Sequence, residues 1–152
     1  MNYDGAIFEE TKEVGIGVIV CNENCEVLVA LSKRISLLSL VKVLEALIAR
    51  IIIQFIVELV ILQLDFARDS NVVYKAIIVG DPPLSAIGHI VKDIVSIASF
   101  LRTHSFFHTR RQGNSIAHAL AKRARFSFLL FVCMKSIPQN ILCFVVCDIP
   151  IT

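Results

Sequence analysis

The chain has 152 residues, which is the length of one ordinary domain and enough to bury a sizeable hydrophobic core. Its 15 basic and 13 acidic residues give a net charge of +2, so net charge neither indicates nor excludes a nucleic-acid partner. Hydrophobic residues make up 56% of the sequence and charged residues 18%, against about 25% charged in average soluble domains. The sequence therefore contains either a membrane segment or an unusually apolar soluble domain.

The first part of the sequence predicts strands. Residues 2–8 can form a first strand, and the apolar, β-branched runs 14–20 and 26–31 predict two more. The polar residues 22–24 lie between these two runs, so we expect a hairpin there.

Residues 41–59 predict an amphipathic helix. Polar positions recur at a spacing close to four residues, at Lys42, Glu45, Arg50, Gln54 and Glu58. Such a stripe argues against a membrane span, because a charge near the centre of a spanning helix costs roughly 2.5–3.5 kcal/mol.

The sequence then alternates between strand and helix signals. Residues 60–66 alternate in polarity and predict a strand. Residues 69–71 offer helix-capping side chains before a predicted helix at 72–77, and the Gly-Asp-Pro-Pro run at 80–83 predicts a stop.

Two further helices frame a last short strand. Ser85 can cap a helix whose apolar positions continue to Leu101, and residues 105–108 predict a strand. Asn114 can cap a final amphipathic helix that runs to Arg125. This order of elements predicts an α/β domain with a mixed sheet flanked by helices.

Residues 1–125 form the predicted domain, and residues 126–152 are an apolar tail, packed on the domain or appended to it. The N-terminus has no basic stretch followed by an apolar run, so we expect no secretory signal. The odd number of cysteines, five, fits reduced thiols. We therefore expect an intracellular protein, nuclear or cytoplasmic, that is not secreted. We also expect a monomer.

Three carboxylates stand out as candidate site residues. Asp4 lies in the first predicted strand, Glu45 on the polar stripe of the long helix, and Asp69 just beyond an apolar strand, where open α/β sheets place their sites. Each alone has an ordinary explanation, such as a helix cap for Asp69 or a solvated side chain for Glu45. Together they could hold two magnesium ions, which prefer oxygen ligands.

Short segments in a fixed order carry a resemblance to a known family. They are Asp4-Gly5-Ala6, Gly15-Ile16-Gly17-Val18-Ile19, Glu26-Val27-Leu28, Leu44-Glu45-Ala46, Gln54-Phe55 with Glu58-Leu59, Asp69-Ser70 with Val72-Val73, residues 80–87, 107–114 and 117–122, and Asp148-Ile149-Pro150. The ordered set resembles plant ribonuclease H-like domains, the type 1 ribonuclease H family associated with reverse transcriptases.

The resemblance implies a ribonuclease H-like fold, with a five-stranded mixed sheet and helices on both sides. It implies an endonuclease that hydrolyses the RNA strand of RNA–DNA hybrids with two Mg²⁺ ions, for which Mn²⁺ can substitute. It makes Asp4, Glu45 and Asp69 the expected metal ligands and catalytic carboxylates. The fourth acidic position of the family falls on His118, which we expect to complete the catalytic rim.

The resemblance also implies a nucleic-acid surface and places Arg110 and Arg111 beside the site. Phosphate contact is the functional interpretation of these two residues, and a solvated turn is the ordinary one. Asn114 and Lys122, on the last helix, complete the expected binding set. A hybrid duplex is thus the expected partner, and no membrane is expected.

Several residues depart from the family pattern. Cys25 and Val60 replace glycines that would adopt a left-handed backbone easily, and Ala67-Arg68 replaces the usual Glu-Gly before Asp69. Arg111 stands where the family has a mobile catalytic histidine, so that role is expected to be lost. The alternative function is therefore a catalytically degenerate nucleic-acid-binding or interaction module on the same fold. A small membrane protein is the last alternative.

Overall fold

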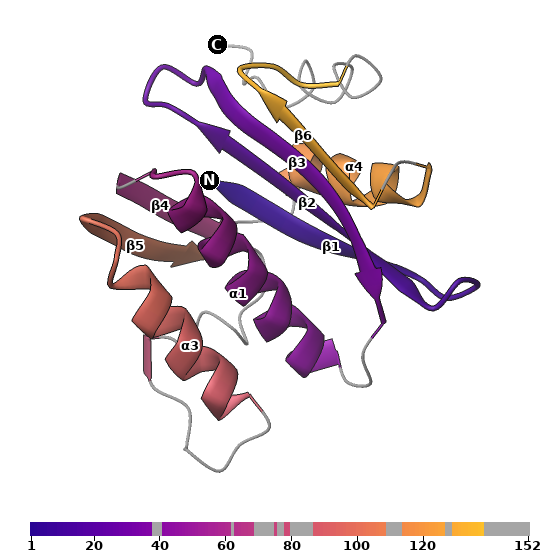
Figure 1. Ribbon diagram of the computed structural model, residues 1–152, viewed down its shortest axis with the longest axis horizontal. Helices are drawn as coiled ribbons and strands as arrows, with labels where there is room; N and C mark the ends of the chain where they lie inside the picture. The colour runs from indigo at the N-terminus through magenta and orange to yellow at the C-terminus, as the bar shows by residue number, and fades with distance from the viewer. Residues whose placement is uncertain are drawn as a thin grey trace. The chain divides into compact units, whose positions relative to one another are not determined.

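The computed structural model describes residues 1–37, 41–61, 63–68, 75, 78–79, 87–108, 114–126 and 129–138. The chain forms two compact units, and Figure 1 shows their elements. The first comprises Met1–Leu37 and Thr109–Thr152, and the second Leu38–His108.

The first unit contains an antiparallel sheet. Its strands are β1 (Asn2–Phe8), β2 (Glu13–Cys21), β3 (Val27–Ser36) and β6 (Leu130–Met134), and they neighbour one another in that order. The three strands and the hairpin predicted from the N-terminal part of the sequence are confirmed. The strand β3 is longer than predicted, since it continues past residue 31 to Ser36.

The second half of β3 was not predicted, because several of its side chains are polar. Ser32 is fully buried, and its hydroxyl donates a hydrogen bond of 2.8 Å to the carbonyl of Leu120. The Arg34 guanidinium lies 3.4 Å from a carboxylate oxygen of Glu13 on the neighbouring strand. The hydroxyl of Ser32 is hydrogen-bonded and Arg34 is paired with an opposite charge, so a polar run that is typical of a strand end belongs to the strand here.

The last helix, α4 (Ser115–Arg123), lies across one face of this sheet and continues into a 3₁₀ turn, Ala124–Phe126. The helix was predicted. It is short, and the side chains on its inner face are small. Ala117 and Ala121 on this face are fully buried. Small side chains allow a helix to approach a sheet closely.

The strand β6 was not predicted, since it falls within the apolar tail assigned to residues 126–152. It pairs with β3 from Val29↔Met134 to Lys33↔Leu130. The Arg123 guanidinium of α4 lies over the Phe131 ring, 4.2 Å from its centroid, which ties β6 to the helix. An apolar run of this kind does not reveal its partner strand in the sequence.

The second unit contains α1 (Val41–Glu58), β4 (Gln63–Arg68), α3 (Gly88–Ala98) and β5 (Thr103–His108). The strands β4 and β5 are parallel neighbours, paired from Gln63↔Thr103 to Arg68↔His108. All four elements were predicted, although β4 begins at residue 63 and not at 60.

The helix α1 is amphipathic, as its stripe of polar residues predicted. Its buried residues are Leu44, Ala46, Ile48, Ala49, Ile52, Ile53 and Ile56. Ala46 packs with Ile87 and Val91 from the segment that begins α3, and Arg50 forms an ion pair of 3.1 Å with Asp93. No helix among the described residues is long and apolar enough to cross a membrane.

Four described residues other than glycine have positive φ, and two of them, Cys25 and Val60, stand where a glycine was expected. Cys25 in the β2–β3 turn has φ 61°, and Val60 after α1 has φ 59°. The Val60 amide donates to Val57, and the Ile61 amide donates to Ile56, so α1 ends in a Schellman motif with Val60 at its left-handed position. The expectation of strained replacements at both positions is confirmed, because a residue other than glycine rarely adopts positive φ, and a β-branched residue such as Val60 does so least of all.

Several sequence predictions fall largely outside the described residues. These are the caps at 69–71, the stop at 80–83, the cap at Ser85, most of the helix at 72–77 and the last part of the tail. In that stretch Lys75, Ile78 and Val79 are described, and each is helical. The residue that precedes α3 is Ile87, whose side chain makes no capping hydrogen bond.

Candidate functional site

The candidate site in the first unit is built on β1. Asp4 faces Gly17 across the antiparallel β1–β2 pair. Since alternate residues of a strand point to the same side, Asp4 shares its side with Ala6 and Phe8, which pack against Ala121 of α4. The carboxylate of Asp4 therefore lies on the side of the sheet that α4 covers.

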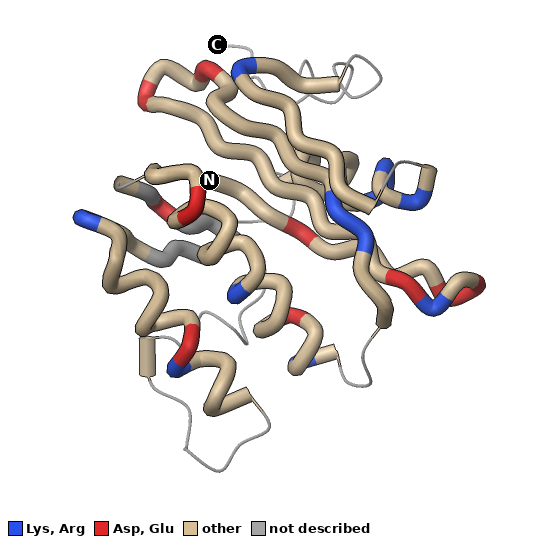
Figure 2. Tube along the Cα trace, viewed as in Figure 1, with Lys and Arg blue, Asp and Glu red and all other residues tan. Residues whose placement is uncertain are grey.

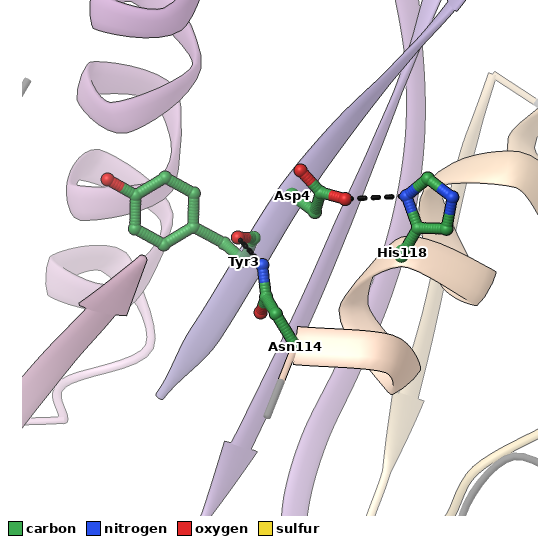
Figure 3. Close-up of polar contacts among 4 residues, drawn as sticks. All are labelled: Tyr3, Asp4, Asn114 and His118. Atoms are coloured by element: carbon green, nitrogen blue, oxygen red, sulfur yellow. Dashed lines mark hydrogen bonds and ion pairs between the residues drawn. The ribbon is translucent and has the colours of Figure 1, made fainter. Parts of the chain in front are cut away.

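The helix brings His118 to this carboxylate. His118 Nδ1 lies 2.6 Å from Asp4 Oδ2, as Figure 3 shows, and these residues are 114 positions apart in the sequence. The Asp4 side chain is 16% exposed and that of His118 is 47% exposed, so the pair lies at the rim of the packed region. An ionised carboxylate only accepts hydrogen bonds, so the proton of this bond sits on Nδ1 when Asp4 is ionised. Nε2 of His118 then points away from Asp4.

Asn114 attaches the start of the same helix to the same strand. Its amide Nδ2 donates a hydrogen bond of 2.9 Å to the carbonyl of Tyr3 (Figure 3). Asn114 precedes α4 directly, as predicted, but its side chain makes no capping hydrogen bond. Asn114 and His118 are four residues apart and therefore share a helix face, so two successive residues of β1 are held by successive turns of α4.

Asn114 was predicted to contact nucleic acid, and in the structure it is only 2% exposed. Its Oδ1 is buried without a hydrogen-bond partner among the described residues. In this conformation the side chain fastens α4 to β1, and contact with nucleic acid through it stays a prediction.

The other two predicted carboxylates belong to the second unit. Glu45 is half-buried on α1 of the second unit, and Asp69 lies outside the described residues. The convergence of Asp4, Glu45 and Asp69 therefore stays a prediction.

The predicted phosphate-binding residues are only partly described. Arg110 and Arg111 lie outside the described residues, whereas Lys122 is exposed on α4, four residues after His118. At 1.5 Å per residue, Lys122 lies about 6 Å further along the helix on the same face. A basic side chain thus follows the Asp4–His118 pair along the helix surface.

Other basic residues of the first unit are paired with acidic ones. Figure 2 shows acidic and basic positions gathered at the β1–β2 turn. Arg125 forms an ion pair with Glu10, and Lys12 Nζ lies 3.5 Å from Glu9 Oε2. Part of the basic charge after α4 is therefore neutralised within the unit.

The donor atoms of the pair can be compared with the needs of a divalent cation. The Asp4 carboxylate suits a hard cation such as Mg²⁺, and its second oxygen points away from His118 (Figure 3). The His118 imidazole suits Mn²⁺ better than Mg²⁺. Among the described residues, no three His, Cys, Asp or Glu side chains are close enough together to hold a metal ion. By donor chemistry alone, the Asp4 carboxylate fits the expected magnesium, and the His118 imidazole fits manganese better.

Sequence reasoning placed His118 at the rim of the site but missed its hydrogen bond to Asp4 and the attachment of Asn114 to Tyr3. The four-residue spacing of Asn114 and His118 was the signal that could have revealed a shared face. The backbone partner on β1 could not be read from the sequence, because a carbonyl oxygen carries no residue identity.

Comparisons with known proteins agree with this fold. The family model described as "Reverse transcriptase-like" matches residues 2–124. RNase H1 from the halophilic archaeon Halobacterium salinarum superimposes with a TM-score of 0.71 at 16% identity, covering 82% of this chain and 95% of the archaeal chain. The N-terminal RNase H domain of a Mycobacterium tuberculosis protein gives a TM-score of 0.67 at 19% identity, covering 81% and 89%.

No curated protein matches the sequence. The likeness to the two solved structures shows the fold, which is ribonuclease H-like as predicted. The origin of the sequence in plants is not part of these findings. The matched residues 2–124 cover most of the chain, and the chain therefore belongs to the reverse transcriptase-like family.

Proposed function

We propose that this chain is a ribonuclease H-type endonuclease that binds RNA–DNA hybrids and hydrolyses their RNA strand with a divalent metal. The observation that carries the proposal is the Asp4 carboxylate, which is mounted on the first strand of a ribonuclease H-like fold and bonded to His118. Membership of the family supports the class of partner and reaction.

The chain's own residues have distinct tasks in this proposal. Asp4, together with Glu45 and Asp69, would hold the metal, and a bound divalent cation would act as a Lewis acid on the scissile phosphate. Asp4 also orients the imidazole of His118 through Nδ1, so that Nε2 points away from Asp4 and would be the nitrogen that faces the substrate. Lys122, with Arg110 and Arg111, would contact the phosphate backbone.

The test is cleavage of an end-labelled RNA–DNA hybrid with Mg²⁺ and separately with Mn²⁺. The wild-type protein should cleave the RNA strand internally, and Asp4→Asn and Asp69→Asn should each abolish cleavage while leaving the protein folded. Single-stranded RNA and duplex DNA serve as controls and should remain intact. Equal cleavage by wild-type protein and Asp4→Asn would overturn the proposal.

One observation favours a second candidate, a catalytically degenerate module that binds hybrids without cutting them. Oδ2 of Asp4 is already bonded to an imidazole, which competes with a cation for the same oxygen. Hybrid binding in a mobility-shift assay without cleavage in either metal would identify this second function.

A further inference from the structure

We infer that Gly17 is a positioning residue for the Asp4–His118 pair. Gly17 is the cross-strand neighbour of Asp4 on β2, and it lies directly beneath α4. Because glycine has no side chain, α4 can approach the sheet closely at the turn that carries His118. The inference rests on the proposed function only in treating this pair as the site.

The contacts at Gly17 leave no room for a single added carbon. A Cβ at this position would approach the carbonyl oxygen of Ala117 and the amide nitrogen of Ala121 to well under 3.0 Å, which real Cβ atoms essentially never show. It would also lie 2.8 Å from Leu120 Cβ. Two of the three close atoms belong to the helix backbone, so the clash cannot be relieved by rotating a side chain.

His118 lies between the two residues whose backbone Gly17 touches. Carbon and oxygen atoms normally stay about 3.3 Å or more apart, so alanine at position 17 must push this turn of α4 away by roughly 1 Å. The His118–Asp4 distance of 2.6 Å would lengthen by a similar amount, beyond hydrogen-bonding range. The distance between Asp4 and His118 therefore depends on Gly17, which has no side chain and lies on β2, a strand that carries neither member of the pair.

Gly15 supplies a matched control on the same strand. A Cβ there would clash with the carbonyl group of Ala121 and would lie 3.0 Å from Ala124 Cβ, so its contacts continue into the following turn of the helix. Alanine at either glycine should destabilise the first unit. Only the clash at Gly17 involves Ala117 and Leu120, which lie on either side of His118 along the helix.

The test measures the side-chain nitrogen chemical shifts of His118 in protein labelled with ¹⁵N-histidine, at one fixed pH. The signal is assigned by its loss in His118→Gln. Wild-type protein should show a protonated, hydrogen-bonded Nδ1. Gly17→Ala should shift His118 toward the Nε2-protonated form that free imidazole side chains favour, and Gly15→Ala should keep the wild-type signature.

Hybrid cleavage gives a second readout, because a displacement of about 1 Å at a reacting group can cost on the order of a hundredfold in rate. Gly17→Ala should lose cleavage to that extent, and Gly15→Ala should lose much less. If the wild-type protein does not cleave hybrids but the shifts behave as expected, the positioning role stands and the proposed function fails.

If Gly17→Ala does not fold, Ala121→Ser tests whether displacing the same part of α4 has the same effect, since it adds one atom where α4 packs against Ala6 and Phe8. A partial shift of the His118 signals is expected in that variant. A wild-type signature in whichever of the two variants folds, or an equal change in Gly15→Ala, would overturn the inference.

Discussion

The hydroxyl of Ser32 on β3 donates a hydrogen bond to the carbonyl of Leu120 on α4, across 88 residues of sequence. This carbonyl lies in the helix turn between His118 and Lys122. The bond therefore fastens the helix to the sheet from the side opposite to β1, where Asn114 and His118 are attached.

We expect Ser32→Ala to lower the free energy of unfolding by about 1 kcal/mol, the usual net contribution of a buried hydrogen bond. The measurement is urea denaturation, monitored by circular dichroism. Ser36→Ala, at the exposed end of the same strand, is the control and should change stability by less than about 0.5 kcal/mol. Equal effects of the two substitutions would contradict a role for the hydroxyl.

We expect Val60→Gly to stabilise the protein. Val60 is exposed and adopts φ 59° at the left-handed position of the Schellman motif that ends α1. An L-residue with a branched side chain costs roughly 1–2 kcal/mol there, and glycine relieves this strain at a smaller entropic cost. A net gain of about 0.5–1 kcal/mol should appear as a higher denaturation midpoint in urea.

Two further variants test this explanation. Val60→Asn should gain part of the same stability, since asparagine tolerates the left-handed conformation. Val41→Gly, at the exposed first residue of the helix, should not stabilise the protein. A Val60→Gly protein that is less stable than wild type would show that the valine contributes more than its strain removes.

The positive φ angles at Val60 and Cys25 show what the sequence could predict. Both were predicted, because replacing a glycine at a chain reversal keeps the reversal and raises only the free energy of the left-handed conformation. The hydrophobic periodicity of α1 predicted its buried face in the same way, because one helix fixes that pattern locally.

Features that depend on two distant segments could not be predicted. The continuation of β3 through Ser32 and Arg34 looked like a strand end, since the partners of these side chains are Leu120 and Glu13. For the site, the sequence identified Asp4 and His118 as candidates from their order in the chain. It gave no indication that one would donate a hydrogen bond directly to the other.

We expect His118→Asp to raise the rate of Mg²⁺-dependent hybrid cleavage and to narrow the wild-type preference for Mn²⁺. The substitution replaces an imidazole, a poor ligand for magnesium, by a carboxylate beside Asp4. A change of about tenfold or more is expected, the scale on which residues supporting a metal ligand alter affinity. The measurement is single-turnover cleavage in each metal.

The control for this substitution is His118→Asn, which removes the imidazole without adding charge and should not favour magnesium. Thermal denaturation with and without Mg²⁺ supplies an independent readout. The Asp variant should be less stable than wild type without the cation, because two carboxylates then face each other, and should gain more from its addition. An unchanged rate and an unchanged metal preference in folded His118→Asp would place His118 outside the metal shell.

We expect hybrid binding to weaken steeply with salt and to show little sequence preference, since basic residues contact phosphates and not bases. The logarithm of the association constant falls with the logarithm of the salt concentration. Lys122→Ala should make this slope less steep by about 1, the contribution of one phosphate contact. Lys92→Ala, which removes an exposed lysine of α3, is the control and should leave the slope unchanged. Fluorescence anisotropy with a labelled hybrid between 50 and 200 mM salt, a range over which several phosphate contacts have a large effect, measures both.

The pairing of β6 with β3 has a consequence for where this domain can be cut. The family match ends at residue 124, before β6 begins at Leu130. A protein trimmed to the matched residues would lose the partner of Val29–Lys33 and expose a row of unpaired amide and carbonyl groups. A long strand edge recruits other chains more readily than a short one, so the trimmed domain, with the ten-residue β3 in place of the five-residue β6 at this edge, should aggregate more readily than the longer one. The segment beyond the family boundary therefore acts as a cover for the sheet.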